Sequence, residues 1–461
     1  MRKSVIAALL CGSMFAYSSA AVAQEPAAEA QAEPTEPDPS DAAADAAIAA
    51  AEPVDELQAK IELLQAQVEA LQEALEGVKA AQVKATPSWK GAPQLLDKEA
   101  GWSFKPRGRL MYDLGYVGGP NGYSNPGLGF SNEVRRARLG VEGTVPGNFG
   151  YKLELDFAPG EVEFTDAFLS HTRGPWEFIV GQHNNFQSLE ELTSSLHSSF
   201  IERAAFTDAF GFERRVGVSA QYAKGKFIAQ AGLFSDNISD LNSVGDDNNS
   251  WSMDGRLVFA PMMGANQLHF AVSAHQRELN DAGSSVRYRQ RPLVHTTDVR
   301  FADTGTISGV DSETGLGLEA AGIFGPFYAA GEAYWQKVRR NGDDPTFFGS
   351  YVDVGYFFTG ETRGYKGGKF DRVKVKKGFD KDGFGSLGVN LRWDYLDLED
   401  KGFLGGTQNA FQASLNWKPT DFLLFGLNAA HILYDDAAIA ETDGDRDYSV
   451  NVAGMRAQVD F

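Results

Sequence analysis

The chain has 461 residues, of which 43% are hydrophobic and 12% aromatic, with 50 glycines and a formal net charge of -20. A chain with this much negative charge is not expected to bind nucleic acid. The single cysteine, Cys11, lies in the N-terminal apolar stretch, so we expect the exported chain to have no disulfide, thiolate metal ligand or cysteine nucleophile.

Residues 1–23 have the pattern of a secretory signal peptide. Arg2 and Lys3 provide a positive start, residues 5–16 are mostly apolar, and Ala21-Val22-Ala23 provides the small residues that signal peptidase requires. A buried helix is the alternative, but it does not account for these flanks. We expect the segment to be removed on export, which would change the formal net charge from -20 to -22.

Two further segments precede the main body of the chain. Residues 24–53 consist mainly of Ala, Glu, Pro and Asp, so they bury too little apolar surface to offset chain entropy, and we expect a disordered spacer. Residues 54–84 carry apolar side chains spaced alternately by four and three, at Leu57, Ile61, Leu64, Val68, Leu71, Leu75 and Val78.

This heptad spacing keeps one apolar seam on a helix and predicts an oligomeric coiled coil. An amphipathic helix packed on the rest of the protein is the alternative. Ile61 and Val68, at two of the three a positions, with Leu at d, nominally favour a dimer.

From Trp102 to Phe461 the apolar period changes to two. Tyr151, Leu153, Leu155 and Phe157, for example, alternate with Lys152, Glu154 and Asp156. A soluble sandwich has strands of this kind, but short turns alternating with long polar segments favour an outer-membrane β-barrel. No stretch reaches the roughly 18 apolar residues of a membrane helix. We therefore assign residues 85–461 to a barrel.

The connections predict an antiparallel barrel of 16 strands, with 18 as the alternative, when residues 277–312 are treated as one long loop. Another long loop is expected at 398–406, and a long inner turn at 362–383. A barrel of this size leaves an aqueous channel, so we expect a lumen that is polar throughout. We expect no plug domain, since only a spacer and a helix precede the barrel.

The long segment at residues 184–212 mixes large apolar side chains with charges. We expect it to fold into the barrel and narrow it; a cap over the barrel mouth or a subunit contact is the alternative. The candidate constriction residues are Phe186, Leu189, Glu190, Glu191, Ser194, Ser195 and Arg203.

Alternation also predicts which basic side chains face the lumen. Arginine suits weak binding of anions because its guanidinium stays charged and forks onto oxyanions. The alternative is that these groups pair with lumen acids and brace the wall. The basic run at 366–381 is interpreted either as an anion-gathering inner turn or as a solvated charge run. The pore-lining basic candidates are Lys105, Arg107, Arg109, Arg136, Arg138, Arg215, Arg256, Arg392 and Arg456.

Four ordered motifs resemble the phosphate-selective porin O/P family: G-Q-H-N-N-F-Q-S-L-E-E-L-T-S-S at 181–195 with F-I-E-R at 200–203, Y-F-F-T-G-E-T-R at 356–363, L-R-W-D-Y-L-D-L at 391–398, and G-M-R-A-Q-V-D-F at 454–461. The resemblance covers roughly residues 100–461. It implies a 16-stranded trimeric channel with an inward-folded third loop, so a trimer is preferred to the dimer suggested by the heptads. It also implies a preference for anions such as phosphate.

Our sequence-based prediction is therefore a porin in the outer membrane of a Gram-negative bacterium, surrounded by lipid and passing small solutes, with anions such as phosphate favoured. The acidic excess of the barrel, 48 acids against 37 bases, leaves a general non-selective porin as an alternative. A tether that contacts the envelope through residues 24–84 is another. An outer-membrane hydrolase is disfavoured because the seven histidines are scattered, and we expect no catalytic site, metal or cofactor.

Overall fold

The structure is a computed structural model that describes residues 54–85, 88–158, 160–241, 250–279 and 284–461. The predicted signal peptide and spacer, residues 1–53, lie outside the described residues. Helix α2 (Val54–Ala85) crosses the boundary between two compact units, since the first unit ends at Val78 and the second begins at Lys79. No helix in the described ranges has the length and apolar character needed to cross a membrane.

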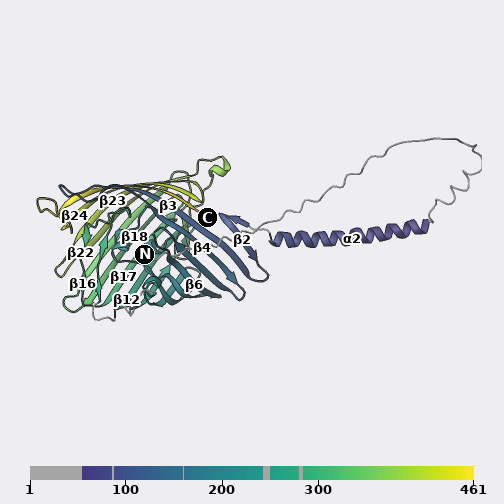
Figure 1. Ribbon diagram of the computed structural model, residues 1–461, viewed down its shortest axis with the longest axis horizontal. Coiled ribbons are helices and arrows are strands. Elements are labelled where there is room, and N and C mark those ends of the chain that lie inside the picture. Colours follow the sequence, from purple (N-terminus) through teal and green to yellow (C-terminus); the bar gives the residue numbers. More distant parts are fainter. Residues whose placement is uncertain (1–53, 86–87, 159, 242–249, 280–283) are drawn as a thin grey trace, which may run out of the picture. The chain divides into compact units, whose positions relative to one another are not determined.

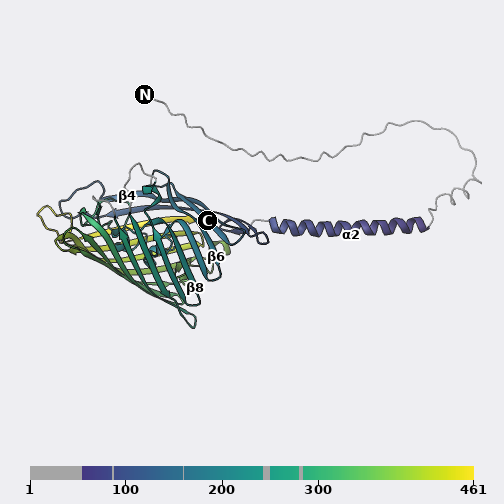
Figure 2. The same ribbon diagram turned by 90° about the horizontal axis from the view of Figure 1, so that it is seen from below.

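The second unit is a closed antiparallel barrel of 16 long strands, as predicted (Figures 1 and 2). The last strand pairs with the first, from Val452 opposite Val117 to Asp460 opposite Arg109. The barrel strands are β3 (Trp102–Val117), β4 (Gly129–Val145), β5 (Phe149–Asp156), β6 (Glu163–Arg173), β7 (Trp176–Asn184), β8 (Arg214–Lys224), β9 (Phe227–Phe234), β10 (Trp251–Phe259), β12 (Asn266–Glu278), β17 (Val310–Phe324), β18 (Phe327–Arg340), β19 (Thr346–Phe357), β22 (Ser386–Asp400), β23 (Phe403–Thr420), β24 (Leu423–Asp435) and β25 (Tyr448–Asp460).

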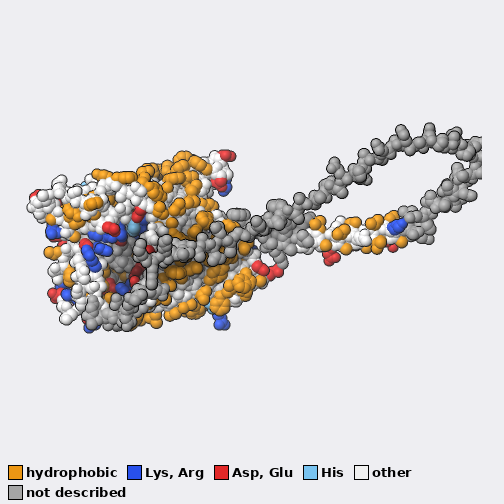
Figure 3. All heavy atoms as spheres, in the orientation of Figure 1, with side chains coloured by type: hydrophobic (Ala, Val, Ile, Leu, Met, Phe, Trp, Pro, Cys, Tyr) orange, Lys and Arg blue, Asp and Glu red, His pale blue; other side chains and the backbone are white. Residues whose placement is uncertain are grey.

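Short strands extend the barrel sheet at two places. β1 (Ser88–Lys90) pairs with β2 (Ala92–Asp97), and β2 covers the edge of β3 beyond the point where β25 ends. β11 (Met262–Met263) joins β12. The main alternation is as expected for a barrel in lipid: Leu110 and Tyr112 are 48% and 41% exposed on the outside, whereas Asp113 is buried inside. On the face shown in Figure 3, apolar side chains cover much of the wall and most charged side chains lie toward one end.

The connections differ from the prediction at one external loop. β22 continues to Asp400 and β23 begins at Phe403, so residues 398–406 are mostly strand and not a long loop. The two strands keep pairing across a bulge between Asp397 and Glu399, which leaves only a tight turn between them. Residues 287–301 form no barrel strand, which agrees with a count of 16.

Four long connections contain short elements of their own. Loop 3, residues 185–213, contains α3 (Leu189–Leu192) and α4 (Ala205–Ala209), and the segment after β9 contains α5 (Ile238–Leu241). Loop 5, residues 279–309, contains β13 (Ser285–Val286), β14 (Arg289–Gln290), β15 (Ala302–Asp303) and β16 (Ile307–Ser308). The inner segment, residues 358–385, contains β20 (Gly364–Lys366), β21 (Lys369–Asp371) and a 3-10 turn (Phe379–Lys381).

The lumen is not polar throughout, which corrects the sequence-based expectation. Phe206 of α4 is fully buried against the inward-facing rings of Tyr334 and Tyr351, with ring centroids 5.9 and 6.3 Å apart. Tyr288 of loop 5 packs on Phe347 in the same apolar cluster, which runs along β17 to β25. Apolar residues of the two loops need an apolar surface, and these inward tyrosines and phenylalanines provide it. One side of the lumen is therefore solid.

Candidate functional site

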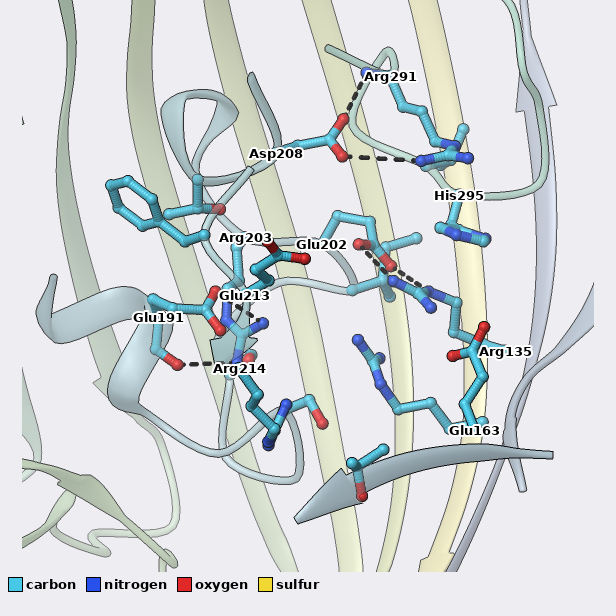
Figure 4. Close-up of a pocket in the computed structure, with 18 of the residues that line it drawn as sticks. Arg135, Glu163, Glu191, Glu202, Arg203, Asp208, Glu213, Arg214, Arg291 and His295 are labelled. Atoms are coloured by element: carbon cyan, nitrogen blue, oxygen red, sulfur yellow. Dashed lines mark hydrogen bonds and ion pairs between the residues drawn. The ribbon is translucent and has the colours of Figure 1, made fainter. Parts of the chain in front are cut away.

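Two cavities lie between loops 3 and 5 and the barrel wall, and members of this apolar cluster line part of each: Ile201 and Leu293 in one, Phe210 and Tyr288 in the other. Cavity A has a volume of about 290 Å³, and cavity B of about 430 Å³. The charged residues that line cavity A are Arg135, Arg136, Arg138, Glu163, Glu191, Glu202, Arg203, Asp208, Glu213, Arg214 and Arg291 (Figure 4). The charged residues that line cavity B are Asp208, Glu213, Arg215, Arg277, Arg287, Arg289, Arg291, Arg300 and Glu313.

A bulge in β4 brings two consecutive arginines into the lumen. Met111 of β3 pairs with Arg136 and Tyr112 pairs with Val134, so Arg135 is the extra residue. A bulge leaves one residue out of the alternating pattern, and strict alternation would point Arg135 outward. Instead, its Nε donates to Glu202 Oε1 of loop 3 at 2.9 Å.

Arg136 is the buried arginine of cavity A that lacks a carboxylate partner. Its side chain is within 3.8 Å of the Met111 sulfur, and its Nε has no hydrogen-bond partner among the described residues. Only 8% of the residue is exposed. Arg136 lines cavity A, so the part of its guanidinium that reaches the cavity can donate to an incoming anion.

The other arginines of the wall are held by carboxylates. Arg138 contacts Asp156 at 2.7 Å and Glu154 at 3.3 Å, and Arg109 contacts the same Glu154 at 3.1 Å. Arg109 also donates to Ser195 Oγ of loop 3 at 3.1 Å. These pairs fix the guanidinium groups in place and offset part of their charge.

Arg214 reaches cavity A through an interruption in the sheet. The pairing of β6 with β7 stops at Ala167 and Gln182, although both strands continue to pair with their other neighbours. The Gln182 side chain fills the gap by donating to the Phe164 carbonyl at 2.6 Å. Beyond it, Arg214 Nε donates to Asp166 at 2.8 Å, and Lys152 contacts the same carboxylate at 2.5 Å.

The predicted basic residues fall into separate groups. Arg136 and Arg138 line cavity A and Arg215 lines cavity B, while Arg109 bonds to loop 3 near cavity A. Lys105 and Arg107 lie toward the short-turn end, where Lys105 lines a separate recess and Arg107 pairs with Glu142 at 2.5 Å. The remaining three, Arg256, Arg392 and Arg456, line neither cavity.

Those three arginines brace the wall and its inserted segments. Arg392 contacts Glu190 at 2.8 Å and Asp353 at 3.0 Å, with its side chain 0% exposed. Arg256 donates from Nε and Nη2 to the two carboxylate oxygens of Glu319, at 2.8 and 2.5 Å. Arg456 donates from Nε and Nη2 to the two carboxylate oxygens of Asp113, at 2.8 and 2.6 Å. The contacts of these three arginines fit the alternative interpretation, in which a lumen arginine pairs with acids and stabilises the barrel wall.

Loop 3 is fastened to the solid side of the lumen through its backbone. Glu332 of β18 accepts from the N–H groups of Leu189 and Glu190 at 2.9 and 2.7 Å, at the start of α3. Asp394 of β22 accepts from the Ala205 N–H at 3.0 Å, at the start of α4. Carboxylates at helix starts satisfy N–H groups that have no partner within the helix.

Some of the predicted constriction residues line cavity A, and others attach loop 3 to the barrel wall. Glu191, Ser195 and Arg203 line cavity A, and Arg203 also donates to the carbonyls of loop 3 residues 190, 191 and 193 at 3.0 Å. Phe186, Leu189 and Glu190 are buried in contacts with the wall, and Ser194 Oγ accepts from the Leu196 N–H at 3.4 Å.

The inner segment folds into the barrel from the end opposite loops 3 and 5. Gly368 accepts from Arg256 Nη2 at 2.9 Å through its carbonyl, and the Tyr365 hydroxyl bonds to His269 Nδ1 at 2.6 Å. Arg372 pairs with Asp460, and Asp371 lies 3.6 Å from His197 of loop 3. The basic run at 366–381 is therefore partly inside the lumen and not wholly a solvated inner turn.

Electrostatics in the loops follow from these contacts. Burial alone would raise the pKa of Glu202, but Arg135 and Arg456 hold it well below its usual range. Burial raises the pKa of Glu191 despite Arg203. Burial, reinforced by Arg372 and Lys418, lowers the pKa of His197 to about 3, so this histidine is neutral at physiological pH.

Alternation did not reveal every cavity residue. Arg135 and Arg214 were missed because a bulge and an unpaired strand end change the direction of their side chains. Arg277 was missed at the end of β12, where the predicted loop began. The run of three arginines within 135–138 was the signal available in the sequence.

Comparison with known proteins agrees with this geometry. The sequence profile of the family described as phosphate-selective porin O and P matches residues 104–461. The chain belongs to this family. The porin is 27% identical to Porin O of Pseudomonas aeruginosa over 400 residues, covering 78% of this chain and 89% of that protein. It is 47% identical to an uncharacterized protein of Caulobacter vibrioides over 393 residues, covering 83% of this chain and 78% of that relative.

Solved structures show the same fold. An anion-selective porin from Comamonas acidovorans superposes with a TM-score of 0.52 at 13% identity, covering 78% of this porin and 100% of that chain. A loop-deletion mutant of OmpT from Vibrio cholerae superposes with a TM-score of 0.50 at 12% identity, with coverage of 78% and 100%. The protein is thus a porin of the Gram-negative outer membrane, and family and fold indicate a channel rather than an enzyme.

Proposed function

We propose that this porin favours small anions, phosphate among them, and that they pass through cavities A and B. The observation that carries the proposal is the local excess of arginine. Among the described residues, cavity B has six arginines against three carboxylates, and cavity A has six against five. Local charge of this kind steers ions even though the whole chain is acidic.

The unpaired Arg136 and the paired arginines around it have different effects on an anion. A phosphate oxygen can accept from Arg136 without displacing a carboxylate. At Arg138 or Arg214 it competes with Asp156 or Asp166. Competition keeps binding weak, and conduction requires an anion to leave as readily as it enters. The family's description and that of the Comamonas porin point the same way.

A salt gradient across a planar bilayer tests the proposal. We expect stepwise conductance from folded porin and a reversal potential shifted toward the chloride value, and we expect added phosphate to reduce the chloride current. A general non-selective porin would conduct with little shift. Cation selectivity would contradict the proposal.

We also propose that the porin is a homotrimer whose α2 helices associate. The heptad side chains Ile61, Leu64, Val68, Leu71 and Leu75 are 51–69% exposed. The flanking positions at Gln65, Gln67 and Gln72 are uncharged, so identical helices meet without like-charge repulsion. The same exposed seam supports the second candidate role, an envelope contact through residues 24–84. Chemical cross-linking of the purified porin distinguishes a trimer from a dimer or monomer.

A further inference from the structure

Cavities A and B share one short stretch of wall. Asp208, Phe212, Glu213 and Arg291 line both of them, three from loop 3 and one from loop 5. We call these four residues the waist. Among the described residues, those that line both cavities all belong to the inserted loops, so an anion moving directly from one cavity to the other passes the waist.

The charge of the waist differs from that of the cavities on either side. The Arg291 guanidinium is already engaged, since its Nη1 lies 3.7 Å from Asp208 Oδ1 and its Nη2 donates to Asp298 at 2.9 Å, and the Arg291 backbone N–H also donates to Asp208 Oδ2 at 2.7 Å. Asp208 and Glu213 have side chains that are 40% and 42% exposed to the cavities. The waist thus has two exposed carboxylates and one arginine whose charge is already paired. It is therefore acidic, whereas the cavities on either side have more arginines than carboxylates.

Glu213 is the better placed of the two carboxylates to act on a passing ion. It directly precedes β8, so the strand holds its backbone, and its Oε1 accepts from Arg215 Nη2 at 3.0 Å. That contact uses one oxygen of the Glu213 carboxylate. The rest of the carboxylate faces the water of the waist.

We propose that Glu213, with Asp208, forms an acidic barrier that limits anion transfer between the two arginine cavities and thereby sets the anion-to-cation permeability ratio of this porin. The inference rests on the proposed anion path. Repulsion at the waist keeps an anion from settling across both cavities, and it admits cations that the arginines alone would exclude.

The groups around Glu213 determine how the barrier responds to pH. Arg215 faces it from β8 and Arg277 from β12, while Asp236 and Asp240 face it from the segment after β9. Glu313 of β17 is held by Arg277 at 3.3 Å, and Asp208 and Arg291 complete the waist. Burial raises the pKa of Glu213, opposed by Arg215 and Arg277 and supported by Asp240 and Asp236.

A carboxyl with a raised pKa becomes neutral earlier as the pH falls. Acidification therefore removes the charge of Glu213 before that of an ordinary surface glutamate. The barrier weakens, so anion selectivity rises as the pH falls toward that pKa. In a Glu213→Gln variant the contribution of Glu213 to this response is absent because its charge is already gone, and what remains comes from other acids such as Glu191, whose pKa is also raised by burial.

Reversal potentials in a potassium chloride gradient test the barrier in wild type, E213Q and D208N. At neutral pH we expect each variant to raise the anion-to-cation permeability ratio by about twofold or more. We expect acidification to raise the wild-type ratio toward that of E213Q and to change E213Q much less. E213D, which keeps the charge, should behave as wild type, and so should D343N, which removes an exposed acid outside both cavities.

The outcomes separate this inference from the proposed function. A wild-type channel without anion preference would overturn the proposed function. An anion-selective wild type whose ratio is unchanged in both E213Q and D208N would overturn the acidic barrier alone. An increase in E213D as large as that in E213Q would also overturn it, because the effect would then follow from the altered shape and not from the lost charge.

Discussion

At the scale of single residues, arginines of the same predicted class have opposite roles. Arg136 has no carboxylate within bonding distance among the residues described, whereas Arg392 is 0% exposed and touches two carboxylates, Glu190 and Asp353. The first is available to a solute, and the second is part of the contact that attaches loop 3 to the wall. Position relative to the inserted loops makes the difference, since alternation assigns both to the lumen.

Replacing each of these arginines by glutamine separates selectivity from stability. We expect Arg136→Gln to lower the anion-to-cation permeability ratio about twofold or more, with little change in unfolding, because no carboxylate loses a partner. We expect Arg392→Gln to destabilise the barrel by about 3–5 kcal/mol, because it leaves buried Glu190 and Asp353 without their cation. Reversal potentials and unfolding in detergent measure the two effects. Equal destabilisation by both variants would contradict this division.

At the scale of elements, loop 3 behaves as a fixed part of the wall. Glu332 accepts from two backbone N–H groups of α3 and from the Tyr351 hydroxyl at 2.9 Å, and the Ser199 carbonyl accepts from side chains of β22 and β23. Each buried polar group of the loop that is satisfied in this way resists local opening. The narrow path therefore depends on anchoring residues that the solute never touches.

Removing the anchor at Glu332 should loosen the constriction. In Glu332→Ala the first N–H groups of α3 lose their acceptor, and we expect a larger, noisier single-channel current and faster proteolysis within loop 3. The matched control is Val352→Ala on the lipid face of β19, where the side chain is 52% exposed and touches no loop. Identical current noise in Glu332→Ala and wild type would mean that other contacts suffice to hold the loop.

At the scale of the whole molecule, the barrel and the part of helix α2 before Lys79 lie in separate compact units. The barrel sheet closes on itself through β25 and β3, so the proposed ion path lies within one chain. Helix α2 has an apolar seam that the described residues of its own chain leave exposed. Conduction and self-association are therefore expected to depend on different parts of the chain.

Deletion of residues 24–84 tests this separation. We expect the shortened porin to keep its conductance and anion preference, because both cavities lie within the barrel. We expect its oligomer to dissociate at a lower temperature than the full-length oligomer on semi-native gels, because the helix seam no longer contributes. An envelope defect in cells without any change in oligomer stability would favour the tether role.

The sequence by itself determined the barrel, because lipid outside and water or packed polar groups inside impose a period of two on every strand. It also indicated the count of 16 strands and the inward fold of loop 3. Only the tertiary structure decided which charges form the path. Bulges and an unpaired strand end redirect Arg135 and Arg214, while loops 3 and 5 fill one side of the lumen and bury Arg392. These outcomes depend on contacts between residues far apart in the chain, such as Arg135 with Glu202, and no local pattern records them.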